Sequence, residues 1–107
     1  MVVATGYIDQ AKLASEVEKA ARRLGPEVVR LKHRLGPDTN GDPSIDFRIV
    51  LADDVVQQAI HEDTLAEVTG RITGTLFEEL HPYENWGLVP YFAFRSFSEE
   101  PTPGEWA

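Results

Sequence analysis

The chain has 107 residues, of which 42% are hydrophobic and 26% are charged, and its net charge is −8. This composition is typical of a single globular domain and excludes a disordered chain. Cysteine is absent, which excludes a disulfide framework, a thiol nucleophile and a thiolate metal site. No run approaches the roughly 18–20 apolar residues of a membrane span, and the first ten residues lack the pattern of a secretion signal. We therefore expect one cytoplasmic domain over residues 1–107, with flexible ends at 1–7 and 98–107.

The charge is distributed unevenly along the chain. Residues 1–35 carry seven basic and four acidic side chains, a net of +3, whereas residues 36–107 carry three basic and fourteen acidic side chains, a net of −11. This acidity argues against nucleic-acid binding, which depends on Lys and Arg neutralising phosphates. The asymmetry favours docking to a basic partner or self-association. A solvated acidic face without a partner gives the same composition.

Two segments have the apolar spacing of an amphipathic helix. The first covers residues 9–24, begins at the N-cap candidate Asp9 and ends before Gly25. The second covers residues 64–80 and begins with a Thr64–Glu67 capping box. Its interior contains two glycines in one column, Gly70 and Gly74. They predict that another element packs very closely there, the first helix through Ala20 or Ala21. Alternatively, the poor helix propensity of the glycines is tolerated because packing dominates.

Three segments alternate between apolar and polar residues and therefore predict strands: residues 27–35, 44–52 and 91–97. The turn-rich sequence at 36–43 predicts that the first two pair as an antiparallel hairpin. In the first strand the side chains expected to point inward are Val29, Leu31, His33 and Leu35. Residues 54–61 are expected to be an irregular lead-in or an extra turn or two of helix, and residues 83–90 a loop.

The predicted fold class is α+β, with the order α-β-β-α-β and a small antiparallel sheet that has two helices on one face. In element order this resembles a ferredoxin-like domain without its first strand, as in the cytosolic domains of cation-efflux transporters. No metal-binding motif of those domains can be placed on this sequence. A three-stranded sheet leaves two edges and one face uncovered, which predicts a homodimer.

Motifs for catalysis and cofactor binding are absent. The sequence contains no G-x-S-x-G, no phosphate-binding glycine loop and no HExxH. The segment DTNGD at 38–42 resembles an acidic calcium loop, but Pro43 and Ile49 stand where an EF-hand needs Gly and Glu. His61 with its two acidic neighbours would diverge on a helix. We therefore predict no catalytic, cofactor-binding or metal-binding residue.

Aromatic residues are concentrated near the C-terminal end, where seven of the ten lie between residues 77 and 97. Tyr and Trp supply large contact areas with a polar tip and are common in binding surfaces. The sequence predicts a partner-binding surface formed by Tyr83, Trp86, Tyr91, Arg95 and Phe97. Alternatively, Trp86 and Leu88 close the open end of a small core.

The segments GDPSIDFRIVL and TGRITGTLFEELHPYENWGLVPYFAFRS resemble small bacterial proteins that have no assigned activity. The resemblance covers residues 9–99. It implies a small stand-alone bacterial cytosolic protein, of the kind that forms one member of a two-gene module. It transfers no site residue.

These observations predict a small acidic, non-enzymatic protein-interaction module that binds itself and a basic protein. One concrete form is an antitoxin-like or immunity-like protein whose acidic surface covers a basic site on a toxin. The alternative is a small-molecule-binding or metal-binding domain, or a minor enzyme. Nucleic-acid binding would need Arg30, Lys32 and Arg34 to form one patch with Arg22 and Arg23.

Overall fold

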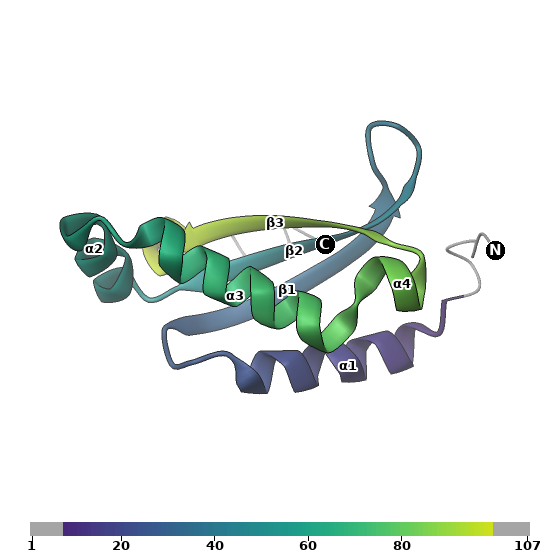
Figure 1. Cartoon of the computed structure of the whole chain (residues 1–107), viewed down its shortest axis with the longest axis horizontal. Coiled ribbons are helices and arrows are strands. Elements are labelled where there is room, and N and C mark those ends of the chain that lie inside the picture. The colour runs from purple at the N-terminus through teal and green to yellow at the C-terminus, as the bar shows by residue number, and fades with distance from the viewer. Residues whose placement is uncertain (1–7, 100–107) are drawn as a thin grey trace.

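The computed structural model describes residues 8–99; the expected flexible ends fall mostly on residues 1–7 and 100–107, which lie outside the described residues. The class is α+β, and the predicted order α-β-β-α-β is confirmed, with two further short helices (Figure 1). The elements are α1 (Gln10–Arg23), β1 (Val28–Pro37), β2 (Pro43–Leu51), α2 (Asp53–Glu62), α3 (Leu65–Leu80), α4 (Pro82–Trp86), β3 (Val89–Ser96) and the 3₁₀ turn η2 (Phe97–Glu99).

The sheet is mixed, with β2 in the centre and the strand order β1-β2-β3. The hairpin of β1 and β2 is antiparallel, as predicted. The expectation that the whole sheet is antiparallel is wrong, because β3 runs parallel to β2. The cause lies in the connection: α3, of 16 residues, spans about 24 Å and carries the chain back along the sheet. A strand that follows such a crossover starts at the same end as its predecessor and pairs in parallel.

The core lies between the sheet and the two long helices, α1 and α3, which both cover one face (Figure 1). Four alternate side chains of β2 are buried in it: Ile45, Phe47, Ile49 and Leu51. The ring of Phe47 stacks on Phe92 of β3, with centroids 5.4 Å apart. Burial of each such large apolar side chain contributes about 1.5–3 kcal/mol. The inward face of β2 therefore contributes four of the large side chains of the buried core.

The first helix forms as the sequence predicts. The carboxylate of Asp9 accepts a hydrogen bond from the backbone N–H of Lys12 at 3.0 Å, which caps α1. At its other end, Arg23 donates to Glu79 of α3 at 2.5 Å and approaches Glu78 at 3.5 Å. The hydrogen bond from Arg23 to Glu79 raises the pKa of the guanidinium above its usual value. These contacts join α1 to α3 on the surface of the helical layer.

A β-bulge changes the first strand. The register with β2 shifts between Val28 and Arg30, so Val28 packs against the core and Val29 is exposed. The prediction that Val29 points inward is therefore wrong. His33, opposite Phe47, is half-buried, and this burial lowers the pKa of its imidazole.

The second half of the helical layer contains more regular structure than expected. Residues 54–61 lie within the regular helix α2, so the alternative of extra helical turns is confirmed and that of an irregular lead-in is wrong. The expected loop at 83–90 is wrong over residues 83–86, which belong to α4, with Pro82 at its first turn. Helix α3 starts after Thr64 as predicted, but the Thr64 side chain makes no capping hydrogen bond. The turn is instead fixed by the left-handed backbone of Asp63 (φ 57°) and by the bond from Thr64 N–H to the Ala59 carbonyl, 2.8 Å long.

The two glycines of α3 face solvent. A Cβ atom added at Gly70 or Gly74 would meet nothing within 4 Å. The prediction that the first helix packs closely against this column is therefore wrong: Ala20 is buried against the other side of α3. The larger apolar side chains of α3 pack against the core, and this packing stabilises the helix enough to offset the poor helix propensity of the two glycines.

Replacement of Gly70 by Ala is expected to stabilise the isolated chain. The added methyl group enters open space, and Ala avoids the backbone entropy that Gly loses in a helix, so the free energy of unfolding should rise by about 0.5–1 kcal/mol. Urea denaturation followed by circular dichroism, at a protein concentration at which light scattering gives the single-chain mass, measures the change. A lower free energy of unfolding would show that the position is enclosed.

Candidate partner-binding surfaces

The five residues predicted to bind a partner lie in separate regions. Tyr83 and Trp86 belong to α4, on the helical side; Tyr83 is 67% exposed, whereas Trp86 is partly buried against the core. Tyr91 and Arg95 stand four residues apart on β3, on the face of the sheet that points away from the core. Phe97 is exposed in η2. The structure does not bring the five into one surface.

Tyr91 is tied to the β1–β2 loop. Its hydroxyl donates a hydrogen bond to Asp38 Oδ2 at 2.9 Å, while Asp38 Oδ1 accepts from the backbone N–H of Asn40 and of Asp42, both at 2.9 Å. The hydrogen bond from the Asp42 backbone, followed by that from the Tyr91 hydroxyl, lowers the pKa of the Asp38 carboxyl. The hydrogen bond that Tyr91 donates to Asp38 raises the pKa of the Tyr91 hydroxyl. The loop that resembles a calcium site therefore uses this carboxylate to hold its own turn.

Arg95 and Phe97 lie at the opposite end of β3. The Arg95 guanidinium donates to the carbonyl of Phe94 at 2.9 Å. Phe97 borders a shallow apolar depression together with Val29 and Ala52. The following residue is fixed, since Ser98 N–H donates to Asp53 Oδ1 at 3.0 Å. Residues 98 and 99, expected to be flexible, thus belong to the turn η2.

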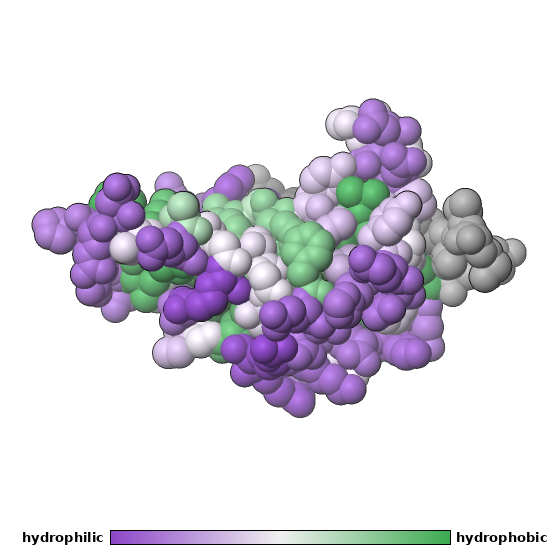
Figure 2. Space-filling model, in the orientation of Figure 1, coloured by the Kyte–Doolittle hydropathy of each residue, from purple (hydrophilic) through white to green (hydrophobic). Residues whose placement is uncertain are grey.

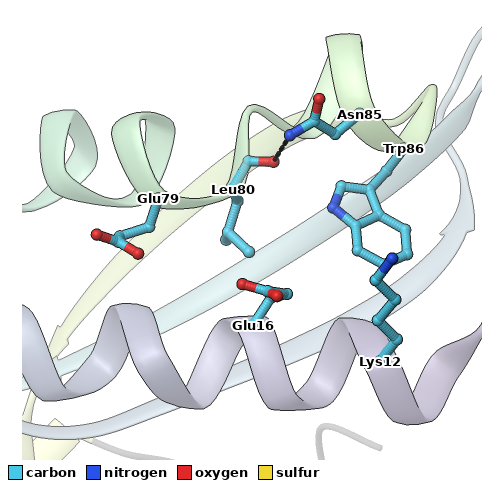
Figure 3. A pocket seen from close by; sticks show the side chains of 6 residues that line it. All are labelled: Lys12, Glu16, Glu79, Leu80, Asn85 and Trp86. Atoms are coloured by element: carbon cyan, nitrogen blue, oxygen red, sulfur yellow. Dashed lines mark hydrogen bonds between the residues drawn. The ribbon is translucent and has the colours of Figure 1, made fainter.

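Trp86 forms the wall of a groove between α1, the end of α3 and α4 (Figure 3). The cavity has a volume of about 420 Å³ and is lined by Lys12, Glu16, Glu79, Leu80, Asn85 and Trp86. The Asn85 amide donates to the carbonyl of Leu80 at 3.4 Å, which secures α4 to the end of α3. Leu88, which follows α4 in the chain, is fully buried. This region therefore closes the core and also forms the groove at the surface.

Basic side chains are concentrated on the outer face of the sheet. The register places Arg48 of β2 beside Lys32, and Arg30 and Arg95 on either side of Val50. Asp46 pairs with Arg34 at 3.6 Å, as the alternation predicts. Arg30, Lys32, Arg34 and Arg48 all have interaction partners.

The patch required for nucleic-acid binding is not formed. Arg22 and Arg23 lie on α1, on the opposite side of the sheet from the basic row of β1. They are paired within the helical layer, Arg22 with Glu18 at 3.1 Å and Arg23 with two carboxylates of α3. The two groups of cations therefore do not act together.

A feature that our sequence analysis missed is the acidic end, which we define as α2, the turn after it and the first turn of α3. Residues 49–70 contain five carboxylates and no Lys or Arg; these carboxylates are Asp53, Asp54, Glu62, Asp63 and Glu67. Within residues 8–99, none of them is in an ion pair. A charge count by segment could have found this region.

Large apolar side chains are exposed within the acidic end. Ile60 is 58% exposed on α2, and Leu65 is 38% exposed at the start of α3. Figure 2 shows hydrophobic atoms among hydrophilic ones at the end of the molecule occupied by α2. Apolar residues surrounded by one sign of charge are a common composition for a protein-binding surface.

A second surface is the uncharged face of α3, formed by Ala66, Gly70, Thr73, Gly74 and Phe77. These positions follow the helical repeat and share one side of α3. Phe77 is 46% exposed, although its ring also contacts Phe92 at 5.5 Å. In Figure 2 a band of pale and light-green atoms marks this side of α3.

Among the described residues, no group of three or more His, Cys, Asp or Glu side chains could hold a metal ion. His61 is exposed on α2, and His81 lies 3.9 Å from Glu84 across the start of α4. No helix between residues 8 and 99 is long and apolar enough to cross a membrane. Comparisons with protein-family models, curated proteins and solved structures find no match to the chain.

Replacement of Tyr91 by Phe is expected to raise the pKa of Asp38 toward its ordinary value, because the variant loses one donor to the carboxylate. Since the folded-state pKa of Asp38 is lowered, its contribution to stability is present above the unfolded-state pKa, near 3.8, and is lost as the pH falls through the lower folded-state value. Carboxyl NMR titration measures the shift. An unchanged Asp38 pKa would contradict a role for the Tyr91 hydroxyl.

Proposed function

We propose that the chain is a small acidic, non-enzymatic protein-interaction module of the cytoplasm, which binds a basic protein partner and a second copy of itself. The observation that carries this proposal is the acidic end: five carboxylates that form no ion pair within residues 8–99, beside two exposed apolar side chains. An antitoxin-like or immunity-like role is one concrete form. In that form the acidic end covers a basic site of a toxin.

The acidic end is suited to a basic partner on electrostatic grounds. Carboxylates that are not neutralised within the chain attract a basic surface over a Debye length of about 8 Å at physiological salt and speed its approach. Ile60 and Leu65 supply apolar area that a partner would bury. The turn between α2 and α3 is held by backbone hydrogen bonds at Asp63 and Thr64, so little order has to be gained on binding.

Self-association has a different basis. The chain carries a net charge of −8, so most faces of two copies would repel one another. The uncharged face of α3 avoids this repulsion, and its glycines permit two helices to approach closely. Phe77 adds exposed apolar area at one end of that face. These features support a homodimer that pairs α3 with its copy.

Reversing charges in the acidic end should weaken capture of the partner. The double variant Glu62→Lys with Glu67→Lys changes two exposed carboxylates, and its retention of the native-host partner should fall by about tenfold or more, with a smaller salt dependence. Affinity capture at increasing salt, quantified by mass spectrometry, measures this effect.

The matched control is Glu18→Lys with Glu84→Lys, which makes the same change of net charge on α1 and α4. It should retain the partner nearly as well as the unaltered chain. If both double variants lost the partner to the same extent, only net charge would matter. If both retained the partner as well as the unaltered chain does, the acidic end would have no part in the interaction.

The homodimer is tested by molar mass in solution. Light scattering coupled to size exclusion should give twice the chain mass of 12.0 kDa. Gly70→Glu with Gly74→Glu should give the single-chain mass, because it places charge and bulk on the contact. Thr75→Glu, on another side of α3, should remain dimeric. A single-chain mass for the unaltered protein at all concentrations would end this part of the proposal.

A small-molecule-binding domain is the second candidate. The observation that favours it is the groove beside Trp86, whose volume of about 420 Å³ falls in the range of about 300–1,000 Å³ usual for ligand sites. A thermal-shift screen with metals, nucleotides and small organic ions separates the candidates. A rise of several degrees with a metal, a nucleotide or an organic anion would favour this class over the interaction module.

A further inference from the structure

The groove beside Trp86 has a lining that selects a chemical class of ligand. We propose that it binds one organic cation, the guanidinium or alkylammonium group of a side chain, over the indole of Trp86 and beside the carboxylates of Glu16 and Glu79. The inference rests on the proposed function, since such a group would be an Arg or Lys side chain of the basic partner. The groove lies apart from the acidic end and would be a second point of contact.

The shape of the groove suits the end of one side chain. Its floor is Leu80, which is 1% exposed, and its wall is Trp86, which packs against the core. Lys12 and Glu16 rise into it from α1, and Glu79 borders it from α3 (Figure 3). Because the indole packs on the core and α4 is bonded to the carbonyl of Leu80, the aromatic wall is held in place before a ligand arrives.

The two carboxylates of the groove differ from the other glutamates of the same helices. The side chains of Glu16 and Glu79 are 30% and 26% exposed, whereas those of Glu18 and Glu78 are 68% and 71% exposed. Partly desolvated carboxylates interact more strongly with a cation than fully hydrated ones do. The face of an indole also attracts cations. Both features of the lining therefore favour positive charge.

Each carboxylate of the groove already pairs through one oxygen with a cation of the chain, and its second oxygen remains as an acceptor for a ligand. Arg23 contacts Glu79, and Lys19 lies 3.6 Å from Glu16, both from positions that do not line the groove. Lys12 does line it, on the side of Trp86, and among the described residues its ammonium is in no ion pair. A cationic ligand would have to displace this flexible side chain. Lys12 therefore competes with a cation but would assist an anion.

The test uses the full chain with Trp106→Phe, so that tryptophan fluorescence reports Trp86 alone. The probe is agmatine, which carries a guanidinium and an ammonium group, and glutarate serves as the anionic counterpart. We expect agmatine to change the emission saturably and glutarate to leave it unchanged. In Glu16→Gln the dissociation constant for agmatine should rise by about tenfold. In Lys12→Met it should fall several-fold, because a competing charge is removed.

The matched control is Glu18→Gln, which changes an exposed carboxylate of α1 outside the groove and should bind agmatine as the unaltered chain does. Absence of saturable binding, equal affinity in Glu16→Gln, or weaker binding in Lys12→Met would each overturn the inference. If agmatine fails while partner capture still depends on the acidic end, the groove inference is wrong and the proposed function stands. If agmatine binds but no partner is captured, the site takes a free organic cation.

Discussion

The burial of one face of β2 determines the arrangement of the other elements. Ile45, Phe47, Ile49 and Leu51 are each at most 2% exposed, and a strand with such a face must be covered along its whole length. Helices α1 and α3 provide the cover, and β1 and β3 satisfy the backbone of β2 on either side. The charged residues are consequently displaced to the outer face of the sheet, the outer surface of the helices and the acidic end.

The periodicity of the sequence was sufficient to predict the elements that contact β2. Leu13, Val17 and Ala20 mark α1, and Ile72 and Leu76 mark α3, because each set repeats at the helical spacing and is buried in the core. The direction of β3 could not be found in this way, since alternation shows which face a residue occupies and not which way the neighbouring strand runs. The bulge at Val29 was also missed, because one extra residue leaves no mark in the local pattern.

The candidate surfaces were less predictable than the fold. Tyr83, Trp86 and Tyr91 are close in sequence, but a helical turn at α4 and the alternation of β3 direct them to different sides of the sheet. The acidic end depends on a tertiary feature, the tight turn at Asp63, which places the end of α2 beside the start of α3. A total charge of −11 over residues 36–107 indicates acidity but does not locate it.

Half of the ten basic side chains lie on the outer face of the sheet, whereas the carboxylates of the acidic end, which form no ion pair within residues 8–99, lie at one end of the helical layer. In the proposed function the acidic end contacts a basic partner. Amide hydrogen exchange of the chain, alone and bound to the partner recovered from its native host, tests it most directly. We expect slower exchange over residues 53–67 on binding. Slower exchange elsewhere, with residues 53–67 unchanged, would contradict it.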